Sequence, residues 1–166
     1  MANIYDYVID GFVKVCEVIE DHNGHWYYKN IDKEILYADH NSWVYFIVKG
    51  NEIVKCGESG NPLGIALDKR ELHRELQPIK STASRLGRLR NGDGTDKFIR
   101  EALRDYVAIE QVSIWAKRCE KVQTVISIAG NPHTTKASIH KDLELDYLRH
   151  FVQIEGSLPW LNKAFK

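Results

Sequence analysis

The chain has 166 residues, 43% of them apolar, which is enough for one domain with a sizeable core. Lysine plus arginine and aspartate plus glutamate number 23 each, and this balance gives no support to tight non-specific binding of polyanions. No apolar run reaches membrane-spanning length and no signal-peptide pattern is apparent. Three cysteines without metal-ligand spacing, Cys16, Cys56 and Cys119, favour a reduced, cytoplasmic protein.

The first third of the chain has the alternation of strands. Two hairpins are predicted, with strands over 12–19 and 25–31 in the first and over 43–48 and 52–57 in the second. Asn23-Gly24 is typical of the tight turn that would join the first pair.

The middle of the chain predicts three helices and then two more strands. The helices cover 63–76, 82–90 and 95–106, and the strands cover 112–119 and 123–130. Strands and helices mix without regular alternation, so the predicted class is α+β, with a small antiparallel or mixed central sheet flanked by helices.

Residues 138–151 predict a last helix with a carboxylate on its apolar face. Its helical angle places Glu144 between Leu148 and Phe151, whereas Asp142, Asp146 and Arg149 fall on the solvated side. A buried glutamate is costly unless it is paired, hydrogen-bonded or bound to a metal. Two interpretations are therefore open for Glu144, a salt bridge to a buried arginine or a metal ligand.

These elements resemble the GIY-YIG nuclease family over residues 43–162. The stretch "WVYFIV" supplies the first motif's tyrosine, and "VKCGES" corresponds to the second motif. "SRLGRLRNG" is similar to the family's arginine helix, and "LELDYLRHFVQIEGSLPWLN" to its closing signature. The matching positions are Tyr45, Lys55, Gly57, Arg88, Glu144, Pro159 and Asn162. On this basis residues 1–42 are an N-terminal β-hairpin addition to a core of residues 43–166, within one compact domain.

The largest departure from the family pattern is Lys55, which stands where the second tyrosine is expected. Some restriction-type members are similar in carrying lysine there, so the departure points to that branch. Trp43 also replaces the usual glycine of the first motif. The stretch between Gly57 and Arg88 is longer than in compact members, which leaves Arg85 as an alternative to Arg88.

The resemblance implies hydrolysis of phosphodiester bonds. Glu144 would be the single protein ligand of Mg²⁺, with Mn²⁺ as a possible substitute, because both ions accept carboxylate oxygens and water. Arg88 would clamp a phosphate oxygen, and Tyr45 would take the proton from the attacking water. A nearby cation favours a phenolate, and Lys55 could be that cation.

Each of these residues also has an ordinary structural interpretation. Tyr45 could be a strand aromatic, Lys55 a polar residue on a half-exposed strand, and Arg88 part of a solvated charged face. His140, one turn before Glu144, could hydrogen-bond to a residue of the site, but a surface histidine is the expected role. Asn162 could hydrogen-bond near the site or cap the chain end.

The function predicted from the resemblance is a sequence-specific restriction endonuclease acting on double-stranded DNA. The alternatives are a nuclease of the same fold in repair, recombination or mobile-element transfer, and an inactive nucleic-acid-binding protein. Symmetry favours a homodimer, because cutting both strands with one small site usually takes two subunits.

The register of the second hairpin decides whether Tyr45 and Lys55 can act together. Pairing of Val48 with Glu52 leaves a three-residue loop and puts Tyr45 opposite Lys55, whereas pairing of Lys49 with Glu52 leaves the loop Gly50-Asn51 and puts the two side chains on opposite faces. We expect the three-residue loop or an equivalent bulge, with both side chains, Arg88 and Glu144 in one cleft.

Overall fold

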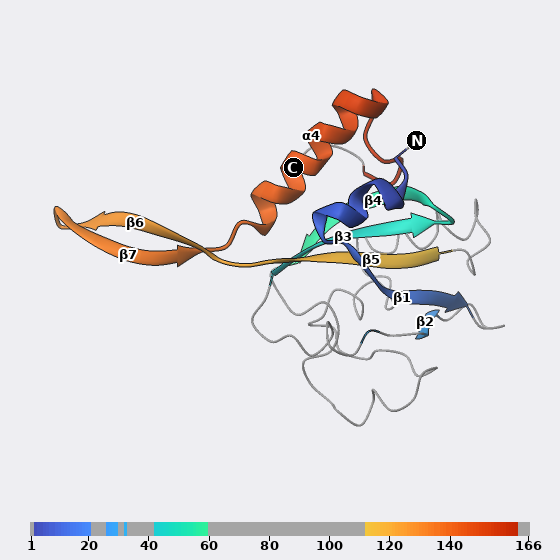
Figure 1. The fold of residues 1–166 in the computed structure, drawn as a ribbon, viewed down its shortest axis with the longest axis horizontal. Helices are drawn as coiled ribbons and strands as arrows, with labels where there is room; N and C mark the ends of the chain where they lie inside the picture. Colours follow the sequence, from blue (N-terminus) through green and yellow to red (C-terminus); the bar gives the residue numbers. More distant parts are fainter. Residues whose placement is uncertain (1, 21–25, 30–31, 33–41, 60–111, 163–166) are drawn as a thin grey trace.

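The computed structural model describes residues 2–20, 26–29, 32, 42–59 and 112–162. These residues form a five-stranded sheet, a two-stranded sheet and a long C-terminal helix (Figure 1). In chain order the elements are the 3-10 helix η1 (Ile4–Asp10), the strands β1 (Val13–Glu20), β2 (Trp26–Lys29), β3 (Ser42–Lys49), β4 (Glu52–Ser59), β5 (Val112–Cys119), β6 (Val122–Ile128) and β7 (Asn131–Ala137), and the helix α4 (His140–Glu155).

The five-stranded sheet is antiparallel throughout, in the order β2-β1-β5-β3-β4. β5 therefore lies between the two hairpins that precede it in the sequence. The N-terminal residues are also tied to the β3–β4 turn, because the Ile4 amide donates to the Asn51 carbonyl at 2.8 Å and the Ile53 amide to the Ala2 carbonyl at 2.9 Å. The two hairpins thus belong to one sheet, and the chain start is hydrogen-bonded to the second of them.

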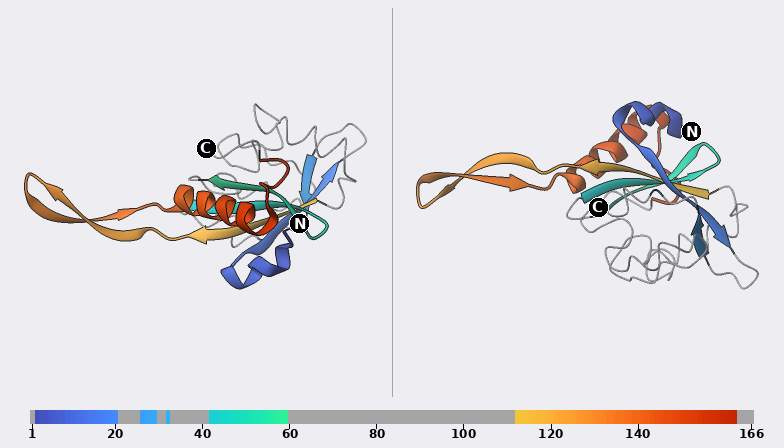
Figure 2. Two further views of the ribbon diagram at one scale, coloured as in Figure 1. Left: turned by 90° about the horizontal axis from the view of Figure 1, so that it is seen from above. Right: turned by 60° about the horizontal axis from the view of Figure 1, so that its bottom comes forward.

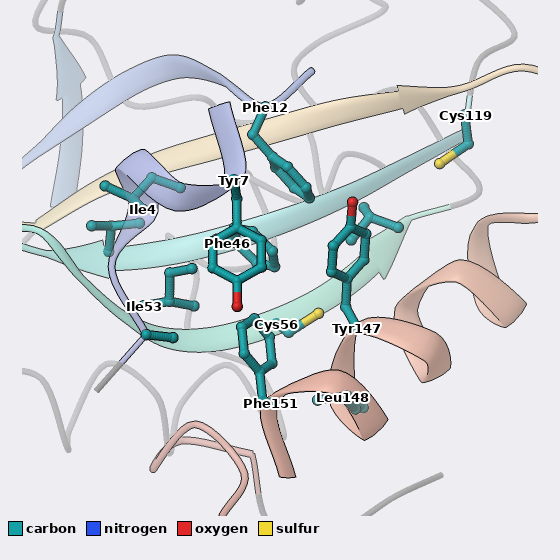
Figure 3. Packing of buried hydrophobic residues seen from close by; sticks show 13 residues of the cluster. Ile4, Tyr7, Phe12, Phe46, Ile53, Cys56, Cys119, Tyr147, Leu148 and Phe151 are labelled. Atoms are coloured by element: carbon teal, nitrogen blue, oxygen red, sulfur yellow. The ribbon is translucent and has the colours of Figure 1, made fainter. Parts of the chain in front are cut away.

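α4 and η1 cover one face of this sheet, and the core between them is aromatic (Figure 3). Phe46 of β3 is at its centre, stacked on Phe12 at 4.0 Å between ring centroids and edge-on to Tyr147 and Phe151 at 5.7 Å. Aromatic pairs with these geometries add to the stabilisation from apolar burial. The even-numbered side chains of β3 thus point towards α4.

The odd-numbered side chains of β3 point to the other face. Tyr45 and Ile47 are buried there, and their neighbours Ile114 and Ala116 on β5 are fully buried. Within the described residues, no helix packs on this side of the sheet. A strand buried on both faces reads as a continuous apolar run, which explains why "WVYFIV" does not alternate.

β6 and β7 form a separate hairpin that projects away from the rest of the molecule (Figures 1 and 2). Its two-residue turn is Ala129-Gly130, and both residues have positive φ, 49° and 79°. That combination is the type I′ turn, whose twist matches that of the strands it joins. Figure 2 shows the hairpin extending beyond the sheet and α4 in two further views.

The α+β class predicted from the sequence is confirmed, with an antiparallel sheet and a C-terminal helix. The predicted strand over 112–119 has the bounds of β5, and β1, β2, β3 and β4 lie within one or two residues of their predicted positions. η1 and β7 were not predicted. The predicted helices over 63–76, 82–90 and 95–106, and the Asn23-Gly24 turn, lie outside the described residues.

No helix within the described ranges is long and apolar enough to span a membrane. The cysteines Cys16, Cys56 and Cys119 are all buried and free. Burial raises the pKa of the thiols of Cys16 and Cys119 above the ordinary value, which disfavours the reactive thiolate.

Candidate functional site

The β3–β4 hairpin has a two-residue loop and a bulge. Lys49 pairs with Glu52, so the predicted three-residue loop is wrong, and the loop is Gly50-Asn51. Gly50 takes a φ of 57° while Asn51 does not adopt positive φ, the pattern of a turn with glycine at its first central position. The register then shifts between Ile47 and Val48, so the predicted bulge is confirmed.

The bulge places Tyr45 and Lys55 on the same face. Beyond the shift, Ile47 pairs with Lys55 and Tyr45 pairs with Gly57. Since directly opposed residues share a face and alternate residues along a strand also share one, Tyr45 and Lys55 are diagonal neighbours. Without the extra residue, Tyr45 would pair with Cys56 and Lys55 would point to the α4 side. The expectation that Tyr45 lies directly opposite Lys55 is wrong, because that place is taken by Gly57.

Gly57 leaves room for the Tyr45 ring. A Cβ at position 57 would lie 2.7 Å from Cε1 of Tyr45 and closer still to Cζ and the hydroxyl oxygen. No real Cβ makes such contacts, so the ring covers the glycine backbone. Tyr45 is 3% exposed and Lys55 is 7% exposed, and each has an interaction partner. Lys55 is thus buried, which is rare for a lysine and excludes the half-exposed strand position considered from the sequence.

Glu144 is buried on α4, as its helical angle predicted. It is 5% exposed, whereas Asp142, Asp146 and Arg149 are exposed. A cavity of about 300 Å³ adjoins it, lined by Glu58, Lys141, Asp142, Glu144, Leu145 and Leu148. The prediction that this carboxylate lies on the buried, apolar face of the helix is therefore confirmed, and the structure adds that open space adjoins it.

Glu58 brings a further carboxylate to the same cavity from the end of β4. Its Oε2 lies 3.4 Å from Nε2 of His140, which is buried at the start of α4. The expectation of a surface histidine is therefore wrong, because His140 is enclosed between α4 and β4. A protonated imidazole here would form an ion pair with Glu58 and hold that carboxylate in place.

Asn162 fastens the strand that carries Lys55 and Gly57. Its side-chain oxygen accepts a hydrogen bond from the Cys56 amide at 2.8 Å, and its side-chain nitrogen donates to the Cys56 carbonyl at 2.8 Å. The Leu161 amide donates to the Val54 carbonyl at 3.0 Å, next to the bulge. β4 is the last strand of the sheet, so these bonds satisfy an edge that would otherwise be open.

The structure brings some predicted site residues together and separates others. Tyr45 and Lys55 share one face of β3 and β4, while α4 with Glu144 packs on the opposite face. The described residues that line the Glu144 cavity include neither Tyr45 nor Lys55. Gly57, under the Tyr45 ring, directly precedes Glu58, so both groups meet at the same end of an edge strand. Arg85 and Arg88 lie outside the described residues, and the single cleft stays a prediction.

The cavity beside Glu144 has a donor set that suits Mg²⁺. Three carboxylates line it, those of Glu58, Glu144 and the exposed Asp142, and this ion prefers oxygen ligands and retains several waters, for which the cavity has room. Within the described residues, no three His, Cys, Asp or Glu side chains lie close enough to hold a metal ion together. An ion here would thus depend on Glu144, with Glu58 in reach of the same space.

No protein-family model matches the sequence, and no curated protein matches it. Solved structures do match. The structure of a mutant of bacteriophage T4 EndoII matches with a TM-score of 0.53 and 19% identity, covering 96% of this chain and 98% of that chain. The fold is similar to that of T4 EndoII. A second match, the restriction endonuclease Hpy188I in complex with product DNA, has a TM-score of 0.47 and 18% identity over 98% of this chain and 87% of that chain.

Glu58 is the residue at the site that the sequence did not reveal. It follows Gly57 in "KCGES", and a polar residue near the end of a strand is ordinary. Its place becomes clear only when α4 packs beside β4 and His140 faces it. The signal for Glu144 was stronger, because a carboxylate within a helical apolar stripe is unusual.

Proposed function

We propose that this chain is a Mg²⁺-dependent endonuclease of restriction type that hydrolyses phosphodiester bonds in double-stranded DNA. The observation that carries the proposal is the buried Glu144 beside a cavity, at the strand end where Tyr45 covers Gly57. Tyr45, Gly57 and Glu144 are also among the residues on which the resemblance of the sequence rests. The shared fold with T4 EndoII supports the fold assignment alone.

Because β4 is at the edge of the sheet, a DNA strand could reach side chains on both of its faces. A phosphodiester at the end of this strand could contact Glu144 and Glu58 on the α4 side and approach Tyr45 on the other. Both faces of a sheet meet at its outermost strand, and β4 is such a strand. Asn162 covers that edge at Cys56, whereas Glu58 lies two residues beyond it, nearer the strand end. We therefore place the scissile bond at the Glu58 end of β4.

In this proposal Glu144 holds Mg²⁺, which would polarise the phosphate and neutralise the departing oxygen. Tyr45 takes the proton of the attacking water, directly or through a bridging water. Lys55, buried on the same face, supplies the positive charge that favours a phenolate. Arg88 grips a phosphate oxygen through its planar guanidinium, with Arg85 as the alternative.

The proposed partner is double-stranded DNA, bound by a homodimer whose two-fold axis would match a palindromic site. The proposed location is the cytoplasm, where the buried thiols would stay reduced. Residues 1–42 are proposed as an N-terminal addition to a core of residues 43–166.

The test is to incubate the purified protein with long unmodified DNA and Mg²⁺ and to sequence the fragment ends. Discrete ends at one short sequence support a restriction enzyme. Cleavage at scattered or structured sites would instead support a nuclease of repair, recombination or mobile-element transfer. Binding without cleavage would support an inactive nucleic-acid-binding protein. Arg88→Ala and Arg85→Ala, assayed in parallel, decide the clamp, since the larger loss of cleavage identifies it.

A further inference from the structure

The projecting β6–β7 hairpin has no packing partner within the described part of the chain, yet it is rich in aliphatic side chains. Every residue of β6 is exposed, and Val122, Val125, Ile126 and Ile128 keep 48%, 66%, 44% and 53% of their surface open. An isolated two-stranded ribbon is marginally stable in water, because it buries too little apolar surface to offset its ordering. These features indicate a surface that is completed by another molecule.

The two outer edges of the hairpin differ. Ile128 and Asn131 flank the two-residue turn, and such a flanking pair exchanges its hydrogen bonds across the ladder. Alternation from this pair directs the peptide groups of every second residue outward. On β7 these outward positions are Pro132, Thr134 and Lys136, and on β6 they are Gln123, Val125 and Ser127.

The β7 edge is protected against strand pairing, and the β6 edge is not. Proline at an outward position removes a donor, and an edge lysine opposes the approach of another strand. On β7, Pro132 and Lys136 protect the edge in these two ways. β6 has no proline and no charged residue, so its outward amides and carbonyls are a template for a further strand.

We propose that β6 pairs antiparallel with β6 of a second copy of this chain, about a two-fold axis at Val125. Val125 then lies opposite Val125 of the second copy, and Gln123 lies opposite Ser127 of the second copy. The result is a four-stranded sheet with the protected β7 edges outermost. The interface is self-complementary, as two-fold symmetry requires.

The side chains fit this arrangement. Cross-strand pairing places Val122, Ile126 and Ile128 on one face of the ribbon. Two-fold pairing at Val125 puts Val122 opposite Ile128 of the second copy, and so merges both aliphatic rows on a single face. Burial of that row adds a hydrophobic contribution to the stability of the paired ribbons, which a lone ribbon lacks.

The chemistry of the hairpin favours protein over nucleic acid as its partner. Binding to nucleic acid depends mainly on lysine and arginine contacts to phosphates. Residues 122–137 contain a single lysine, Lys136, and no arginine, and β6 has no charge at all. The pairing surface is thus aliphatic and neutral, and it is independent of the chemistry proposed at Glu144.

The test compares Val125→Pro with Thr134→Pro by sedimentation velocity. These residues are cross-strand partners, so each proline removes one outward amide at the same level of the ribbon. The wild type and Thr134→Pro should sediment as dimers, and Val125→Pro as a monomer with an unchanged thermal unfolding transition of the core. A monomeric wild type, a dimeric Val125→Pro, or equal loss in both variants would overturn the proposal.

A cross-linking experiment gives a second readout on the same pair. Paired residues that exchange hydrogen bonds have Cα atoms about 5.5 Å apart, within the reach of a disulfide. Val125→Cys should form a disulfide-linked dimer without reductant, and Thr134→Cys should not, while the native cysteines are buried. Equal cross-linking of both would contradict pairing through β6. If the wild type is a monomer and Val125→Pro weakens DNA binding alone, the proposal is overturned and the hairpin is a nucleic-acid contact instead.

Discussion

Tyr45 lies directly opposite Gly57, and its ring fills the space that any side chain at position 57 would need. The bulge beside Ile47 sets this pairing and turns Lys55 to the same face. One extra residue in β4 therefore determines which side chains can act together on that face.

Gly57→Ala should destabilise the chain and displace the Tyr45 ring. The added methyl overlaps Cζ and the hydroxyl of Tyr45, and overpacking of this kind costs about 1–3 kcal/mol. Urea unfolding measures the loss. In a Tyr45→Ala background the same change should cost clearly less, because the overlapping ring is gone. Equal losses in both backgrounds would show that the ring does not limit position 57.

Lys55→Met should lower the cleavage rate about a hundredfold or more and shift the rising limb of the pH–rate profile to higher pH. The reason is that the proposed phenolate of Tyr45 loses its neighbouring cation. Lys49→Met, on the same hairpin, is the matched control and should leave the profile in place. A Lys55→Met enzyme whose rate falls without any shift of the profile would separate Lys55 from the base.

Asn162→Ala should lower the free energy of unfolding by about 2 kcal/mol. The change removes two hydrogen bonds and leaves the amide and carbonyl of Cys56 without their side-chain partner. Thermal unfolding should show a melting temperature lower by about 4–8 °C for a chain of this size. Gln153→Ala, at an exposed position of α4, should change it little. Similar melting temperatures for the two variants would mean that Asn162 does not fasten β4.

Alkaline pH should destabilise the chain through its buried tyrosines. Burial, and then nearby acidic groups, raise the pKa of Tyr7 to about 12. Burial and then the hydrogen bond that the Tyr147 hydroxyl donates to Asp10, 2.8 Å long, also raise the pKa of Tyr147. The unfolded chain loses these protons near pH 10, whereas the folded chain keeps them, so stability falls as pH rises above about 10.

The measurement is the urea midpoint at pH 9 and pH 11. Tyr147→Phe should be less stable than wild type at pH 9, because it lacks the bond to Asp10, but should lose less stability on going to pH 11. Tyr5→Phe alters a tyrosine that is 62% exposed and should follow the wild type. A Tyr147→Phe chain that loses as much as wild type would contradict the assignment.

The sequence was sufficient to predict an element, or the direction of a side chain, where the local pattern of apolar residues agrees with the burial in the fold. β5 and the inward position of Glu144 follow from periodicity, because the side chains that define the pattern are those that pack. β7 was not predicted, since Asn131, Pro132 and Lys136 are polar or strand-breaking and every cross-strand partner is exposed. The bulge was foreseen only as an alternative to a longer loop, because register depends on contacts that no single strand specifies. Glu58 and His140 depend on the packing of α4 beside β4, which is tertiary.

The most direct test of the proposed metal-dependent cleavage is Glu144→Gln, with cleavage and DNA binding measured on the same preparation. The amide keeps the shape of the side chain but removes the charge that would hold Mg²⁺. Asp146→Asn, an exposed carboxylate on the same helix, is the control and should cut like wild type. We expect Glu144→Gln to fold, to bind double-stranded DNA with nearly unchanged affinity and to leave it uncut in Mg²⁺. Cleavage within about tenfold of the wild-type rate would contradict the claim that Glu144 is the metal-binding carboxylate of a nuclease.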